Sequence, residues 1–159
     1  MADVEALKVS IGEITHNRIA IEELLQEGEP SRPLFGVLPL RRVIPQDVHS
    51  VMDYASGAAL LAVGALSDGL PERVVGLGLG AMTIATSLMT DYRLSLAKVI
   101  PIEVHEVADH AVGATALVAP LAVGFRSKLA CYLTMAVGMT TVVASLFTDY
   151  RAQTRGRRR

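Results

Sequence analysis

Charged residues and histidines are absent from four long stretches of the chain, which are rich in Ala, Val, Leu and Gly. A helix of a soluble bundle has polar and apolar residues on opposite faces, whereas these stretches are apolar all round. A chain of 159 residues is too short to bury four such helices in a protein core. We therefore expect an all-α fold with four transmembrane helices, in preference to a compact soluble bundle of unusually apolar sequence. The uncharged stretches are residues 54–67, 74–90, 111–125 and 129–148, and the predicted helices cover 46–66, 72–91, 102–124 and 128–150.

The chain carries an internal repeat. The pattern Val-Ile-Pro-x-x-Val-His occurs at residues 43–49 and again at 99–105. The pattern Ser-Leu-x-Thr-Asp-Tyr-Arg occurs at 87–93 and again at 145–151. Because a repeat of this length corresponds to one supersecondary unit used twice, we expect two helical hairpins that point the same way. The predicted membrane domain, 43–151, consists of the repeats 43–93 and 99–151.

Two segments flank the repeats. Residues 1–42 combine a heptad-like apolar stripe and acidic polar positions with a Pro- and Gly-rich end. We expect a cytoplasmic amphipathic helix followed by a linker, and the acidic face favours docking onto a partner protein over an anionic membrane surface. Residues 152–159 form a basic cytoplasmic tail. The apolar stripe, which is the predicted partner-binding surface, consists of Val4, Leu7, Ile11, Ile14, Ile21 and Leu25.

The distribution of charge predicts the orientation in the membrane. The formal net charge is only −1 and the mean hydropathy is +0.40. Four spans place both termini on one side, and Lys and Arg are more numerous on that side than in the two opposite loops, so both termini are predicted to be cytoplasmic. The first 30 residues lack the apolar segment of a cleavable signal peptide. Cys131 is the single cysteine, which excludes an internal disulfide and a cysteine-based metal site.

Ionisable side chains recur at one end of each predicted hairpin. His49 and Asp53 are one helical turn apart, and so are His105 and Asp109. Polar groups at this depth in a membrane need partners, and pairing among His, Asp and Arg would supply them. The leading interpretation is a structural polar layer that sets the geometry of the two hairpins. The predicted layer comprises His49, Asp53, Asp91, Tyr92, Arg93, His105, Asp109, His110, Asp149, Tyr150 and Arg151.

Three other interpretations of this layer remain open. His49 and His105 are candidate ligands of a haem or another pigment, with aspartates that orient them. The histidines and carboxylates could instead hold a divalent metal ion, or relay protons along an ion path. The chain has no nucleophile motif, phosphate-binding loop or zinc signature, so we expect no catalytic residues and no enzymatic activity. The Arg-rich C-terminus is typical of contact with anionic lipid, and we expect no nucleic-acid partner.

The repeated motif Val-Ile-Pro-x-x-Val-His-x-x-x-Asp, at 43–53 and 99–109, resembles the SPW-repeat family of small bacterial integral membrane proteins. The sequence Ser-Leu-x-Thr-Asp-Tyr at 87–92 extends the resemblance, which covers residues 43–151. The second copy has Ala-Pro-Leu at 119–121 in place of the family's Ser-Pro-Trp, and the chain contains no Trp.

The resemblance implies a four-span fold in the bacterial inner membrane and supplies no catalytic residues. We therefore expect a non-enzymatic accessory or scaffold subunit of a larger membrane complex, such as a respiratory or photosynthetic one. Its expected partners are the lipid bilayer and other membrane protein subunits.

Overall fold

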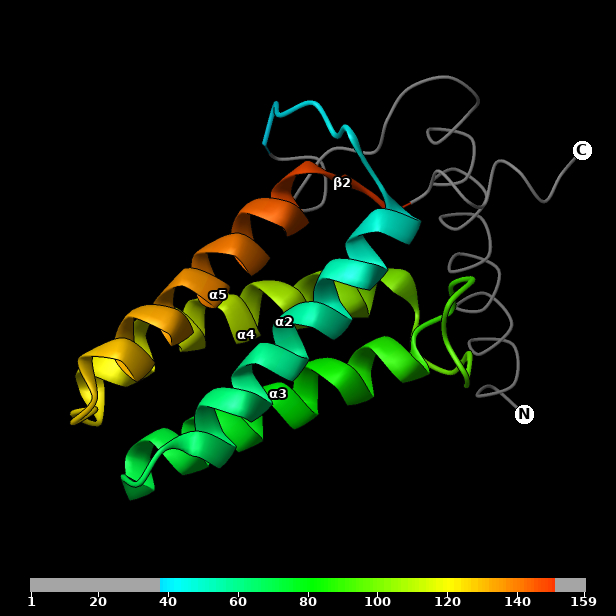
Figure 1. The fold of residues 1–159 in the computed structure, drawn as a ribbon. Helices are drawn as coiled ribbons and strands as arrows, with labels where there is room; N and C mark the ends of the chain where they lie inside the picture. Colours follow the sequence, from blue (N-terminus) through cyan, green and yellow to red (C-terminus); the bar gives the residue numbers. More distant parts are fainter. Residues whose placement is uncertain (1–37, 151–159) are drawn as a thin grey trace, which may run out of the picture.

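The computed structural model describes residues 38–150, which form four long helices (Figure 1). The helices are α2 (Gln46–Leu66), α3 (Leu70–Met89), α4 (Ile102–Ala122) and α5 (Lys128–Phe147). Two short strands, β1 (Ile44–Pro45) and β2 (Thr148–Asp149), flank them. The predicted all-α class with four helices is confirmed for this part of the chain. The apolar stripe between Val4 and Leu25 and the tail at 152–159 lie outside the described residues.

The helix starts follow from the local sequence. Pro45 and Pro101 immediately precede α2 and α4 with φ angles of −62° and −60°, and proline has no backbone N–H that would need a partner there. An acidic residue in each first turn, Asp47 or Glu103, interacts favourably with the helix dipole. At the start of α5, the Ser127 hydroxyl accepts a hydrogen bond from the backbone N–H three residues later at 3.2 Å.

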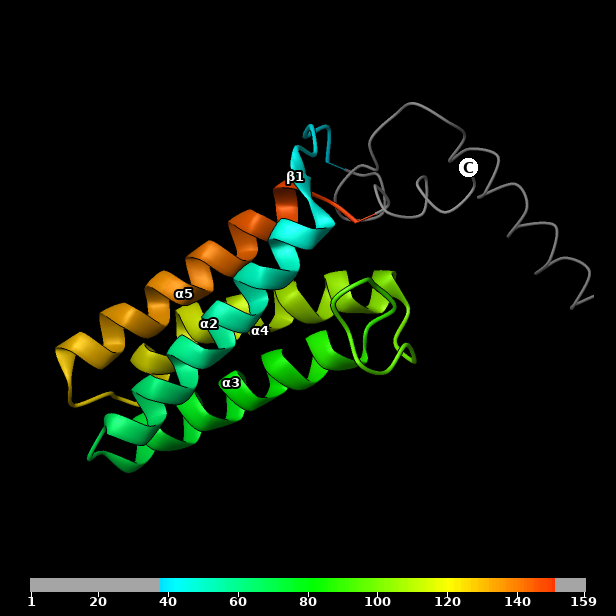
Figure 2. The ribbon, with the colours of Figure 1, turned by 45° about the vertical axis from the view of Figure 1, so that its right-hand side comes forward.

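The four helices form two hairpins, and both hairpin turns lie at the same end of the bundle (Figures 1 and 2). Each helix packs mainly against its hairpin partner, while α2 also adjoins α5 and α3 adjoins α4. At the turn end, the two hairpins are joined by Glu72, which is 1% exposed. Its carboxylate accepts hydrogen bonds from the backbone N–H groups of Arg126 and, at 3.1 Å, Ser127. One oxygen of this buried carboxylate is thereby satisfied by the backbone just before α5, while the other has no hydrogen-bond partner among the described residues.

At the opposite end, equivalent backbone contacts join the hairpins twice. β1 pairs in parallel with β2, so that Ile44 lies opposite Thr148. The corresponding residues of the other copy, Ile100 and Thr90, also form a parallel bridge. The residue before each bridging isoleucine donates its N–H to the last residue of the neighbouring helix, at 2.8 Å in one copy and 3.0 Å in the other. The end of α5 therefore meets the start of α2 as the end of α3 meets the start of α4.

Glycines allow the two helices of each hairpin to approach closely. A Cβ atom added at Gly80 would lie 2.7 Å from the carbonyl oxygen of Gly57. In the second hairpin, a Cβ at Gly138 would lie 2.7 Å from the carbonyl oxygen of Gly113. The same pair of repeat positions is thus used in both copies for direct contact between helix backbones, as small residues are at helix interfaces in membranes.

The helix bounds and the membrane spans both differ from the sequence expectations. First, α3 and α5 end at Met89 and Phe147, two and three residues before the predicted ends, because Thr90 and Thr148 leave the helix to form the bridges. In addition, α3 begins at Leu70, two residues before its predicted start, and α4 ends at Ala122, two residues before its predicted end. Second, among residues 38–150, α5 is the one helix that is long and apolar enough to count as a candidate membrane span. Ionisable, glycine and hydroxyl residues lower the mean hydropathy of the other three helices. The four-span arrangement therefore stays a prediction.

Candidate functional site

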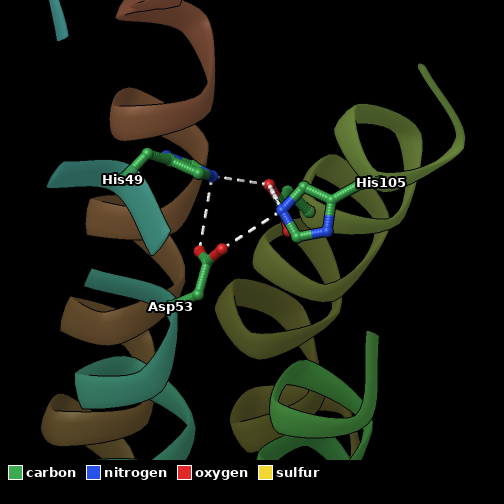
Figure 3. Close-up of side chains that lie close together, drawn as sticks. His49, Asp53 and His105 are labelled. Carbon is green, nitrogen blue, oxygen red and sulfur yellow. Dashed lines mark hydrogen bonds and ion pairs between the residues drawn. The ribbon is translucent and has the colours of Figure 1, made fainter. Parts of the chain in front are cut away.

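Four buried ionisable side chains converge at the end of the bundle opposite the turns. His49 and Asp53 project from successive turns of α2, and His105 and Asp109 from successive turns of α4. Each of the four residues is at most 4% exposed. Figure 3 shows the side chains of His49, Asp53 and His105 pointing toward one another between the helices. We call these four residues the His/Asp cluster.

Contacts within the His/Asp cluster run both along and between the helices. The Nε2 atom of His49 lies 3.4 Å from a carboxylate oxygen of Asp53 on its own helix and 2.8 Å from one of Asp109 on the other helix. The Nε2 atom of His105 lies 3.1 Å from a carboxylate oxygen of Asp53 and 3.2 Å from one of Asp109. Each imidazole therefore faces both carboxylates, and the cluster joins the two hairpins.

A threonine fixes the proton position on each imidazole. The hydroxyl groups of Thr90 and Thr148 donate to the carbonyl four residues earlier, at 2.7 Å and 2.6 Å. Because a hydroxyl has a single hydrogen, each oxygen is left to accept the Nδ1–H of a histidine. These contacts are 3.0 Å for Thr90 with His105 and 2.9 Å for Thr148 with His49. Each threonine belongs to the other hairpin, and each histidine directs Nε2 toward the carboxylates.

Two tyrosines surround the cluster unequally. The Tyr150 hydroxyl lies 2.9 Å from a carboxylate oxygen of Asp109 and 3.1 Å from the Nε2 atom of His49, and it also contacts Ser145. Its repeat counterpart, Tyr92, is equally buried, but its hydroxyl has no hydrogen-bond partner among the described residues. Burial raises the pKa of both phenols above their ordinary value, so both keep their protons at neutral pH. The carboxylate of Asp53 instead accepts a hydrogen bond from Ser87 at 3.1 Å.

Several residues of the predicted polar layer lie apart from the cluster. Asp91 is exposed and forms an ion pair of 3.6 Å with Lys98. Arg93 lies on the surface 3.4 Å from Asp47. The Nδ1 atom of His110 contacts a carbonyl oxygen of its own helix at 2.7 Å.

The remaining two members of the predicted layer lie at the C-terminal end of the second repeat. Asp149 is buried in β2, and Arg151 lies outside the described residues. The structure thus brings together His49, Asp53, Tyr92, His105, Asp109 and Tyr150 from the predicted layer.

The hydroxyl residues of the site are not among the candidates that the sequence pattern indicates. Thr90, Thr148, Ser87 and Ser145 are all fully buried, and each contacts a histidine, an aspartate or Tyr150. The signal was present in the repeat, because both copies of Ser-Leu-x-Thr-Asp-Tyr keep the serine and the threonine. The sequence did not indicate that a threonine of one hairpin contacts a histidine of the other.

The geometry separates the cofactor interpretations of the cluster. The Asp53 carboxylate contacts both imidazoles, so it occupies the space that a haem or pigment plane would need between two axial histidines. The arrangement therefore disfavours a haem held between His49 and His105. The four side chains offer nitrogen and oxygen ligands that a small divalent cation accepts. A proton path through the layer stays a prediction.

Comparison with known proteins finds no family model, no curated protein and no solved structure that matches this chain.

Proposed function

We propose that the protein spans the bacterial inner membrane four times, with both termini in the cytoplasm, and serves as a non-enzymatic accessory or scaffold subunit of a larger membrane complex. The observation that carries this proposal is the distribution of side chains between the interior and the surface. Soluble proteins bury most of their large apolar side chains and expose most of their charged ones. The four helices described here show the reverse.

Polar side chains occupy the interior of the bundle, and large apolar side chains cover its outside. The buried polar residues on the helices are Gln46, His49, Ser50, Asp53, Glu72, Thr83, Ser87, His105, Asp109, Thr134, Thr141 and Ser145. The exposed apolar residues on the helices include Val48, Val51, Leu66, Leu70, Val74, Leu77, Met82, Met89, Val104, Val107, Val118, Leu121, Leu129, Leu133, Met139 and Val143. An apolar surface on every helix is larger than the patches that a soluble monomer exposes, and lipid is the solvent that suits it.

The length of the helices and the positions of their charges agree with this proposal. The helices have 20 or 21 residues. At a rise of 1.5 Å per residue they are about 30 Å long, which matches the hydrocarbon layer of a bilayer. Among residues 38–150, the charged side chains that are exposed on helices are Arg73, Glu103 and Lys128, and each lies in a first turn. Charges at these positions would reach the headgroup region.

The accessory role is supported by the use of the polar groups inside the bundle. The His/Asp cluster, the threonines and Glu72 all join one hairpin to the other. The outer surface is then left for lipid and for the apolar faces of other subunits, which associate through packing in a membrane. The N-terminal stripe from Val4 to Leu25, outside the described residues, is the proposed contact with a cytoplasmic partner.

Single-cysteine labelling tests the membrane arrangement. In a Cys131→Ser background, new cysteines replace the outward, mid-helix residues Ala81 and Met139, or Asp68 and Ser127 beside the two turns. A membrane-impermeant maleimide should label the turn cysteines from the periplasmic side and should leave the mid-helix cysteines unlabelled. Equal labelling of all four positions in intact membranes would contradict the proposal. Solubility in alkaline carbonate would do so as well.

Affinity purification in a mild detergent tests the accessory role. The wild-type protein should copurify with a defined set of membrane subunits. Leu7→Glu and Ile14→Glu, on the predicted N-terminal stripe, should weaken that association, whereas Glu13→Gln, outside the stripe, should not. A wild-type protein that always migrates alone after mild extraction would exclude the role.

A further inference from the structure

The four ligand atoms of the His/Asp cluster lie close enough together to surround one metal ion. The Nε2 atoms of the two histidines lie 2.8–3.4 Å from the facing carboxylate oxygens. One ligand atom from each of the four residues can be chosen so that all lie within 4.8 Å of one another. Zinc bonds to nitrogen and oxygen of about 2.0–2.2 Å place tetrahedral ligands about 3.3–3.6 Å apart. The ligand atoms would therefore have to shift by up to about an ångström relative to one another to bind a zinc ion at the centre of the cluster.

The hydrogen bonds around the histidines are those of metal ligands. Thr90 and Thr148 accept the Nδ1–H groups, so a neutral imidazole has its lone pair on Nε2, directed at the carboxylates. Two lone pairs facing two carboxylates would repel one another, whereas a cation between them binds to all four groups. Metal-binding histidines regularly donate the second ring N–H to an oxygen in this way.

The carboxylates of the cluster also accept hydrogen bonds from neighbouring side chains, and a divalent cation would balance their negative charge. Ser87 donates a hydrogen bond to Asp53, and the Tyr150 hydroxyl donates one to Asp109. Both aspartates are buried, at 3% and 4% exposure. Two ionised carboxylates in such a place need compensating positive charge. One divalent cation supplies it, which leaves the site neutral.

We propose that His49, Asp53, His105 and Asp109 bind one zinc ion, and that this ion joins the two hairpins. A set of two imidazole and two carboxylate ligands suits zinc, and four protein ligands leave no open position for a substrate. The site is therefore structural. Because α2 and α4 each provide one histidine and one aspartate, the ion bridges the repeats, and the proposal does not depend on whether the helices span a membrane.

A metal-free arrangement of the same four residues is the alternative to the zinc site, and experiment can distinguish the two. If both Nε2 atoms carry protons, the same four residues form two imidazolium–aspartate pairs, and no metal is needed. Zinc binding by the purified full-length protein separates the two. The protein is extracted in mild detergent, stripped with a chelator, and titrated with zinc sulfate, with metal content measured by mass spectrometry. We expect one zinc per chain, and we expect that cobalt in its place gives the strong visible absorption of a tetrahedral site.

Three variants locate the ion. The double substitution His49→Gln/His105→Gln should abolish stoichiometric binding. His110→Gln, which changes a histidine outside the cluster, should retain it. Thr90→Val/Thr148→Val, which keeps all four ligands, should weaken zinc binding by about 10–100-fold, as loss of hydrogen bonds to metal ligands does.

Two results would overturn the proposal. The first is a chelator-treated wild-type protein that keeps its helical circular dichroism but takes up no stoichiometric zinc, which would assign the imidazolium–aspartate arrangement instead. The second is equal zinc uptake by the wild type and by the double-histidine variant, which would show that the ion binds elsewhere. The wild-type measurement stands on its own if the double-histidine variant fails to fold.

Discussion

The two hairpins are alike at the cluster end and at the glycine contacts in the middle of their helices, and they differ near their turns. At the cluster end, the first hairpin has His49, Asp53 and Thr90, and the second has the same residue types at the corresponding positions. These residues meet across the repeat in equivalent contacts. Toward the turns, the first hairpin has a second glycine pair, Gly64 and Gly76, which the second hairpin lacks.

The second hairpin fills these two positions differently. Pro120 replaces Gly64 and Thr134 replaces Gly76, and both replacements are fully buried. The helices α2 and α3 therefore touch through backbone atoms near their turn, whereas α4 and α5 are separated there by side chains. The contacts between the hairpins at the cluster end are therefore repeated in both copies, whereas the packing of the helices near the turns is specific to each hairpin.

The largest effect should come from the cluster end. Asp109→Ala and Asp53→Ala each remove a carboxylate that faces two imidazoles, and loss of one member of a buried ionic cluster costs about 3–5 kcal/mol. The two costs should be similar, because Asp53→Ala removes the acceptor of the Ser87 hydroxyl and Asp109→Ala removes the carboxylate acceptor of the Tyr150 hydroxyl. The free energy of unfolding, measured by SDS titration in mixed micelles, gives the comparison.

The repeat supplies a control for these two variants. Asp91→Ala removes an exposed aspartate whose ion pair with Lys98 is on the surface, so the change should stay within about 0.5 kcal/mol. If Asp53→Ala and Asp109→Ala were as mild as Asp91→Ala, the cluster would not be what joins the hairpins.

Charge placed on the outer surface should affect both hairpins alike. Ala81 and Met139 occupy equivalent, exposed positions near the middle of α3 and α5. In lipid, Ala81→Arg and Met139→Arg should each disfavour insertion by about 2.5–3.5 kcal/mol. The fraction of membrane-integrated protein measures this, with Asp68→Arg beside the turn as the tolerated control. A soluble bundle would accept all three changes within about 0.5 kcal/mol, and that outcome would remove the membrane proposal.

The difference between the hairpins near the turns can be tested with alanine. A Cβ at Gly76 would lie 2.5 Å from the backbone nitrogen of Gly64, so Gly76→Ala must push α2 and α3 apart, at a cost of about 2–3 kcal/mol. The corresponding Thr134→Ala removes a hydroxyl that has no partner among the described residues, and it should be neutral or slightly stabilising.

Alanine at a third glycine, Gly78, should increase the stability of the protein instead of lowering it. A Cβ at Gly78 would meet no atom within 4 Å, so Gly78→Ala should stabilise α3 by about 0.5–1 kcal/mol through helix propensity alone. Thermal unfolding in detergent ranks the three variants. Equal effects of Gly76→Ala and Thr134→Ala would mean that the two hairpins pack alike.

The same contrast explains which features could be predicted from the sequence. The starts of α2, α4 and α5 were predicted correctly at residues 46, 102 and 128, because proline and capping residues mark them locally. The ends of α3 and α5 were predicted two and three residues too late, because Thr90 and Thr148 leave the helix for partners in another segment. Local sequence carries no information about those partners.

The same holds for the site, where contacts within one hairpin could be predicted and contacts between the hairpins could not. The sequence predicts that His49 pairs with Asp53 or Asp91, and that His105 pairs with Asp109 or Asp149, in each case within one hairpin. The structure adds the contacts between the helices, His49 with Asp109 and His105 with Asp53, which depend on how the hairpins meet. The repeat marked the polar residues that both copies keep, but it could not show that each copy completes the other.

The smallest expected difference concerns the two tyrosines. Tyr150→Phe removes a hydrogen bond to the Asp109 carboxylate and should cost about 1.5 kcal/mol. Tyr92→Phe removes a hydroxyl without a hydrogen-bond partner among the described residues, so it should change stability little or raise it slightly. SDS titration of both variants makes the comparison, and equal losses would show that Tyr92 also contributes a contact to the cluster end.

Alkaline pH extends this comparison. The burial of both phenols determines whether folding stability rises or falls as the pH increases. Burial raises their pKa in the folded state, so their contribution to stability is complete below the unfolded-state pKa of about 10 and is lost as the pH rises above it. Each Phe variant removes one such group, and its stability should fall less steeply above pH 10 than that of the wild type. The two slopes should be similar, because burial acts on both tyrosines, even though the losses at neutral pH differ. An unchanged slope in Tyr92→Phe would show that this phenol reaches water in the folded protein.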